Sequence, residues 1–304
     1  MTSPHAASEL APYHDEPAQM PSGAPGKNGF LRLGFARRGE RTALVALRRR
    51  APLLVQQALY WDEQMPDLAC VVIVDTAGGI VQGDRHELEI ELAERSRAHL
   101  TTQAATKIQE MDANYASQTQ RVVLHDDAYL EYLPEPVIPY KHSRFVAQTH
   151  ICLPESATLV YADILMPGRK HYGAGEIFGY DLYSSRLSVS RPGGTDLFAE
   201  KFLVEPARSS PSRRGVMGGF HVFGNVLLLT SAPAAERVLA QVPSVVDHAD
   251  GWAAGASRLP NNAGLSYKIL GMESEPVRAK VRDFWSTARL AIVGRPAPAR
   301  FPWR

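Results

Sequence analysis

The sequence predicts a mainly β fold with two α-helices in the C-terminal half. Three observations support this class: one segment with strict two-residue alternation, many short apolar runs between turn signals, and two late segments with helical spacing. The apolar runs recur at roughly 10–15 residues, which is typical of a meander, a sandwich or a solenoid and not of alternating β-α-β units.

Residues 1–28 are rich in Pro, Ala, Ser and Gly and have no apolar period. Such a segment has little apolar surface to offset the entropy lost on ordering. We therefore expect a disordered tail over residues 1–28, followed by a single β domain over residues 29–304.

The clearest strand is His86–Leu92, in which Leu or Ile alternates with Glu at every second position. This period places an apolar face on a core and a carboxylate face in water. Other apolar or β-branched runs predict further strands at 71–74, 98–102, 120–124, 128–133, 144–151, 157–163, 185–190, 197–204, 219–230 and 265–271.

Two helices are expected late in the chain. The first follows Ser231 and Pro233, because proline at an early helical position costs no hydrogen bond. The second begins near Pro276, places apolar residues at i, i+4, i+7 and i+11, and ends at Gly294.

Composition excludes several classes of protein. The net charge is +1, from 33 basic and 32 acidic residues, so no overall field attracts nucleic acid. No apolar run approaches the ~18 residues that a membrane helix requires. The two cysteines, Cys70 and Cys152, form no CxxC pair, which argues against a zinc site or a disulfide framework and predicts a cytoplasmic location.

The segment from Val71 to Gly79 resembles the strand and Asp-x-x-Gly turn that binds magnesium in GTPases, with Asp75 as its aspartate. A phosphate loop of the form GxxxxGK[ST] would have to accompany it, and the sequence has none. Nucleotide chemistry is therefore not expected. The glycines Gly78, Gly79 and Gly83, followed by Asp84, instead predict a tight connection between two strands.

Catalytic and metal-binding patterns are also missing. Thr106 and Lys107 are adjacent, so on a strand their side chains point to opposite faces and do not form a catalytic pair. The ten histidines include no HxxxH or HxH spacing, so no tight metal site is predicted. We expect no enzymatic activity.

Seven short blocks follow one another along the chain: Phe35–Thr42, Gly78–Asp84, Thr101–Lys107, Leu130–Pro134, Asp163–Arg169, Gly175–Phe178 and Gly294–Pro296. Gly168 and Arg169 belong to the fifth block. In these blocks and in their order, the sequence resembles the urease accessory protein D family (UreD, also called UreH).

The resemblance implies an elongated, β-helix-like stack of antiparallel strands with two helices. It also implies an accessory protein for assembly of the urease nickel centre, with no turnover and no tightly bound cofactor, but with nickel in transit. The implied partners are the urease apoprotein, a helical UreF-type accessory protein and a nickel-carrying UreG-type GTPase, with no nucleic acid and no membrane.

A conduit for nickel must bind the ion weakly enough at each step to release it, which carboxylates, hydroxyls and carbonyls do better than clustered imidazoles or thiolates. Acidic and hydroxyl residues in or near the matching blocks are therefore candidates for lining an internal passage. They are Asp84, Thr106, Asp163, Glu176 and Glu200. The alternative is a pure protein–protein scaffold that never contacts nickel.

Overall fold

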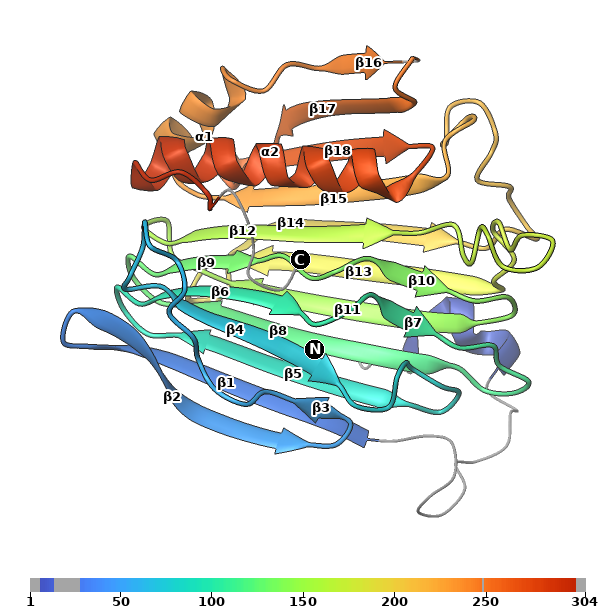
Figure 1. Ribbon diagram of the computed structural model, residues 1–304, viewed down its shortest axis with the longest axis horizontal. Helices are drawn as coiled ribbons and strands as arrows, with labels where there is room; N and C mark the ends of the chain where they lie inside the picture. The colour runs from blue at the N-terminus through green and yellow to red at the C-terminus, as the bar shows by residue number, and fades with distance from the viewer. Residues whose placement is uncertain (1–5, 14–27, 248, 299–304) are drawn as a thin grey trace.

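Two facing β-sheets account for most of the computed structural model, which describes residues 6–13, 28–247 and 249–298 (Figure 1). The first sheet has the order β14-β13-β11-β8-β5-β1-β2, and the second has the order β16-β17-β18-β15-β12-β9-β6-β4-β3. The strands of the first sheet are β1 (Asn28–Arg38), β2 (Arg41–Arg50), β5 (Arg85–Leu92), β8 (Ala116–Leu124), β11 (Arg144–Cys152), β13 (Leu182–Ser190) and β14 (Asp196–Val204). Those of the second are β3 (Leu53–Leu54), β4 (Ala69–Asp75), β6 (Arg97–Thr102), β9 (Tyr129–Tyr132), β12 (Thr158–Leu165), β15 (Val222–Leu229), β16 (Val245–Asp247), β17 (Trp252–Arg258) and β18 (Gly264–Gly271), with β7 (Thr106–Ile108) and β10 (Val137–Pro139) beside them.

The central part of the chain coils as a flattened β-helix. Each coil contributes one strand to each sheet, so β5, β8, β11 and β13 stack in parallel in the first sheet, and β4, β6, β9 and β12 do so in the second. Antiparallel pairing flanks this coil, at β1–β2, at β13–β14, and from β12 through β15 to β18 and β16. The prediction of a mainly β fold with a β-helix-like stack is confirmed. The sheets are mixed, so the expectation of purely antiparallel strands is wrong.

Alternation along the strands fills the space between the sheets. In β5, Leu88, Ile90 and Leu92 point inward and are almost fully buried, as the two-residue period predicts. The main apolar core is continuous between the sheets, and a second core lies between the outer face of the second sheet and the helices.

The two predicted helices form where proline and glycine place their ends. The helix α1 (Ala232–Leu239) has Pro233 in its first turn, and α2 (Ser274–Val293) ends at Gly294, whose φ of 71° is left-handed. Figure 1 shows α2 lying along β15 and β18, with its axis in nearly the same direction as these strands. Among the described residues, no helix combines the length and apolar character needed to span a membrane.

Part of the expected disordered tail is ordered. Residues Ser8–Tyr13 form a 3-10 helix, and Leu10 is fully buried against Val146 and Leu182 on the outer face of the first sheet. This segment differs from the prediction because Leu10 packs against the sheet and Glu9 accepts hydrogen bonds from Ser184 and Lys201. The rest of the predicted tail, residues 1–5 and 14–27, lies outside the described residues.

Candidate functional site

A cavity of about 180 Å³ lies between the two sheets, at the end of the strands where polar side chains replace apolar ones. In the first sheet, Val122 and Ile151 point inward and lie in the core. Two residues earlier on the same strands, Gln120 and Thr149 also point inward and line the cavity. The cavity walls are therefore a continuation of the core, lined with groups that hydrogen-bond, such as the Tyr132 hydroxyl, which donates to Gln120 Oε1 at 2.8 Å.

One end of the cavity opens beside β7 and the loop that follows β4. Gly78, Gly79, Thr106 and Lys107 line it there, and Gly78 and Lys107 are exposed to solvent. A Cβ on Gly79, at φ 147°, would lie 2.9 Å from the Lys107 carbonyl oxygen, so only glycine allows this loop to approach β7 so closely. The predicted tight connection thus forms the rim of the cavity.

Asp163 joins this cavity to a second, narrower one. The second cavity encloses about 30 Å³ and shares Tyr161, Asp163, Tyr183 and Ser185 with the first. It leads to Glu200, whose side chain is 34% exposed. The two cavities therefore adjoin at Asp163, and we refer to the stretch from Thr106 past Asp163 to Glu200 as the route.

Polar side chains form a row at the narrow end. In the second sheet, Asp163 lies beside Asn225, and Asn225 lies beside Lys268, on three adjacent strands. Glu200 faces this row from β14; it accepts a hydrogen bond from Asn225 Nδ2 at 3.1 Å and forms an ion pair with Lys268.

Burial raises the pKa of Asp163 from 3.8 to about 6, and the negative charge of Glu200 adds to this shift, whereas Lys268 opposes it. Asp163 retains some accessible surface because it faces the cavity and not bulk solvent. The enclosed carboxylate therefore carries an electrostatic cost that a cation would relieve.

Asp84 is not among the described residues that line these two cavities. Its Oδ2 accepts a hydrogen bond from the Val81 backbone N–H at 3.0 Å and lies 3.9 Å from Nε2 of His86, which does line the large cavity. Gly83, at φ 78°, donates its N–H to the Tyr115 carbonyl. Asp84 and Gly83 therefore shape the turn behind the cavity wall.

Glu176 also lies away from the route, in the loop after β12. Two hydrogen bonds tie it to Arg169, whose guanidinium lies 4.1 Å from the ring centre of Tyr140 and 3.8 Å from that of Tyr172. The bond from Arg169 is the main reason that the pKa of Glu176 is lowered. Gly168, at φ 124°, would place a Cβ 2.2 Å from the Glu176 carbonyl oxygen, so these residues fold the loop on itself.

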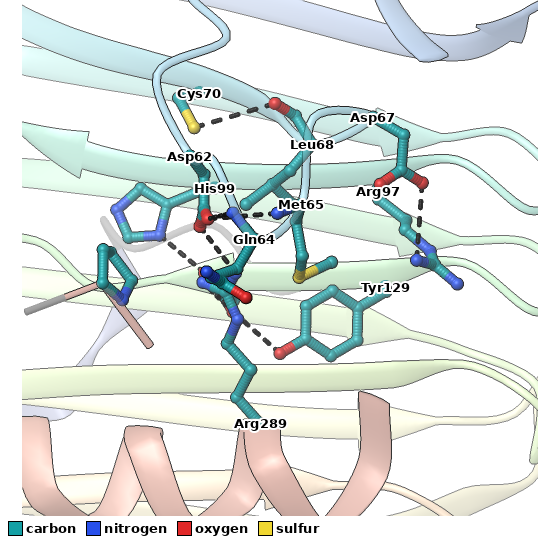
Figure 2. Close-up of polar contacts among 12 residues, drawn as sticks. Asp62, Gln64, Met65, Asp67, Leu68, Cys70, Arg97, His99, Tyr129 and Arg289 are labelled. Carbon is teal, nitrogen blue, oxygen red and sulfur yellow. Dashed lines mark hydrogen bonds and ion pairs between the residues drawn. The ribbon is translucent and has the colours of Figure 1, made fainter. Parts of the chain in front are cut away.

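A buried ionic cluster under α2 was not anticipated from the sequence. Figure 2 shows Arg289 pointing from α2 toward Asp62, and its Nη2 lies 2.6 Å from Asp62 Oδ2. Glu131 accepts hydrogen bonds from Tyr129 Oη and from His99, each at 2.8 Å. Burial alone would raise the pKa of Glu131, but the bond to His99 and the charge of Arg289 outweigh it and lower the pKa.

This cluster occupies the outward face of the second sheet, opposite the cavity. His99 and Glu131 follow the same alternation as their inward neighbours, so they point toward α2 while Leu100 and Tyr132 point inward. A charged residue in the middle of an apolar helical face, as Arg289 is, would have been the signal in the sequence.

Sequence reasoning also missed two residues of the route. Lys268 is the single charged residue of β18. Glu135 lines the first cavity and pairs with Arg278 of α2 at 3.2 Å. Both could have been noticed as isolated charges beside apolar runs.

The side chains along the route offer mostly oxygen donors, and His86 adds one imidazole to the wall of the first cavity. Among the described residues, no group of three or more His, Cys, Asp or Glu side chains is arranged to hold a metal ion. Carboxylate, amide and hydroxyl oxygens bind a first-row divalent cation less tightly than imidazole or thiolate would. The arrangement suits brief contact with a cation.

Comparison with known proteins places the chain in one family. The family model described as UreD urease accessory protein matches residues 27–304. The urease accessory protein UreD 2 of Brucella suis biovar 1 is 58% identical over 297 residues, covering 98% of each chain. The urease accessory protein UreD of Yersinia pseudotuberculosis serotype O:1b is 48% identical over 298 residues, covering 98% of this chain and 93% of its own. The chain therefore belongs to the UreD family of urease accessory proteins.

Proposed function

We propose that the chain is a non-catalytic accessory protein that passes nickel through its interior during assembly of the urease nickel centre. The observation that carries this proposal is the pair of cavities that meet at Asp163. Enclosure between the two sheets makes ionisation of the Asp163 carboxyl group unfavourable, and a passing cation would offset that cost.

The sequence of groups along the route fits transit better than storage. Nickel would enter beside Gly78 and Thr106, meet the Thr106 hydroxyl, cross to Asp163 and leave beside Glu200. Each step offers few ligands, so the ion would be held weakly enough to move on. Asp84 and Glu176, by contrast, would act as structural residues, because neighbouring groups already bind their carboxylates.

The partners in this proposal are the urease apoprotein, a helical UreF-type protein and a nickel-carrying UreG-type GTPase. The relatives are named as urease accessory proteins, which supports a place in urease maturation. Cys70 and Cys152 are free thiols, which suits the reducing cytoplasm.

The test replaces Asp163 by Asn in cells that co-express urease and its accessory proteins. We expect urease that co-purifies with the variant as before but contains at least about tenfold less nickel, because the central carboxylate of the route is gone. Glu87→Gln is the matched control, since Glu87 is an exposed carboxylate on the outer face of β5.

The readouts are the nickel content of the recovered urease and the recovery of the complex. Reduced nickel with an intact complex would support the conduit. Normal nickel with an intact Asp163→Asn complex would refute it and leave the pure scaffold, which contacts partners but not the ion.

A further inference from the structure

Three oxygen-bearing side chains line the narrow end of the route. Asp163 and Asn225 are register neighbours in the second sheet, and Glu200 reaches them from the first. Neighbouring strands lie about 4.8 Å apart, which is a spacing that lets carboxylate and amide oxygens share one cation.

The orientation of the Asn225 amide leaves an oxygen available for a cation. Its Nδ2 donates to Glu200, so Oδ1 lies on the opposite side of the amide, and a cation shared with Glu200 requires this hydrogen bond to break and the amide to rotate. Oδ1 is buried and, among the described residues, has no hydrogen-bond partner. A buried carbonyl oxygen without a donor is costly, and a bound cation would remove that cost.

A cation is already present in the structure at this point, in the form of the Lys268 ammonium group. Lys268 pairs with Glu200, and its Nζ lies 5.6 Å from the ring centre of Phe223, which stacks on Phe202. The Lys268 side chain is 40% exposed, so its flexible stem can carry the ammonium group out to solvent.

Charge counting shows what this movement would do. With both carboxylates ionised, the set formed by Asp163, Glu200 and Lys268 carries a net charge of −1, and it carries −2 when the ammonium group is outside. A charge of −2 matches a divalent cation, whereas −1 favours its departure.

We propose that Lys268 is a tethered counter-cation that gives way to a divalent ion at Asp163, Asn225 and Glu200 and then displaces it on returning. This inference rests on the proposed function, because it assigns the release step of the same route. Lys268 is a positioning residue here: it sets how long the ion stays and does not bind it.

The test measures Ni²⁺ binding to the purified full-length chain by titration calorimetry. Lys268→Met removes the ammonium group and keeps the apolar stem, so we expect Ni²⁺ to bind at least about tenfold more tightly than to the wild type. The matched control is Lys201→Met. Lys201 lies on β14 next to Glu200 but points to the outer face, where it pairs with Glu9.

Two further variants check the assignment. Lys268→Arg keeps the charge and should bind Ni²⁺ like the wild type, which also shows whether the site tolerates substitution. Adding Asn225→Leu to Lys268→Met should remove the gain in affinity, because the amide oxygen is lost. Circular dichroism establishes that each variant is folded before titration.

An affinity of folded Lys268→Met within twofold of the wild type, or no binding to it, would overturn the proposal, as would an equal gain in Lys201→Met. These results differ from a failure of the conduit itself, which appears as normal urease nickel with Asp163→Asn. If the conduit holds and Lys268 acts as proposed, Lys268→Met also lowers the nickel delivered to urease, because the ion is retained.

Discussion

Replacing Asp163 by Asn should stabilise the folded protein at neutral pH. Asn has nearly the same shape as Asp but no charge, so the change removes the cost of an ionised carboxylate enclosed between the sheets. Burial and Glu200 together raise the pKa of Asp163 from 3.8 to about 6, with Lys268 acting against them. A gain in stability with a loss of nickel delivery would be the signature of a group kept for function.

The magnitude follows from the pKa of Asp163. A rise from 3.8 to about 6 corresponds to about 3 kcal/mol against the ionised form, at 1.36 kcal/mol per pH unit. Asp163 keeps some accessible surface, so solvent screens part of this cost, and we expect a gain of about 1–2 kcal/mol for Asp163→Asn.

The raised pKa of Asp163 also determines how the stability of the wild type changes with pH. The folded state binds the Asp163 proton more tightly than the unfolded state does, so the wild type loses stability as the pH rises from 3.8 to about 6. Below 3.8 both states are protonated and the cost disappears; above about 6 it is complete.

Urea unfolding followed by circular dichroism at a series of pH values measures the difference between the two proteins. We expect the Asn variant to be more stable by the full amount at about pH 8, and the difference to shrink toward about pH 4. A difference that is absent at pH 8, or that does not change with pH, would show that Asp163 is not enclosed as described.

Three further substitutions test other parts of the structure. Arg289→Met leaves Asp62 and Glu131 without their buried counter-charge and should cost about 3–5 kcal/mol, as urea unfolding would show; a loss below about 1 kcal/mol would contradict the pairing. Gly168→Ala places a Cβ against the Glu176 carbonyl at φ 124° and should lower the melting temperature, by an amount equivalent to about 1–3 kcal/mol; an unchanged melting temperature would count against this loop geometry. Leu10→Ala should detach the N-terminal 3-10 helix without unfolding the sheets, which limited proteolysis would report as faster cleavage near the N-terminus, whereas protection equal to that of the wild type would argue against this docking.

Much of the local structure could be predicted because it depends on local patterns. The alternation in His86–Leu92 identifies both a strand and its buried face, and Gly294 marks the end of α2 through its left-handed conformation. Strand partners could not be read in this way. A period of two shows which face is buried, but not which strand lies alongside, so the parallel pairing of β5 with β8 was missed.

The candidate site shows the same division. Asp163 was found because a carboxylate within an apolar strand is unusual in any sequence, and the structure places it between the two cavities. Glu200 and Lys268 are 68 residues apart, and their meeting depends on how the two sheets face each other. Asp84 and Glu176 share the residue type of the candidates, but their local hydrogen bonds, which decide their roles, are visible only in the structure.

The coiled arrangement of the strands has a consequence for distance. The two cavities together span the second sheet from β4, which lines the first, to β18, which lines the second; these strands are five positions apart in its order, which corresponds to about 24 Å at about 4.8 Å per strand. Each strand between the two ends adds one strand spacing to this distance, because the span runs along the direction of the backbone hydrogen bonds. A protein with one more or one fewer coil would therefore keep the same two ends, but they would lie one strand spacing further apart or closer together.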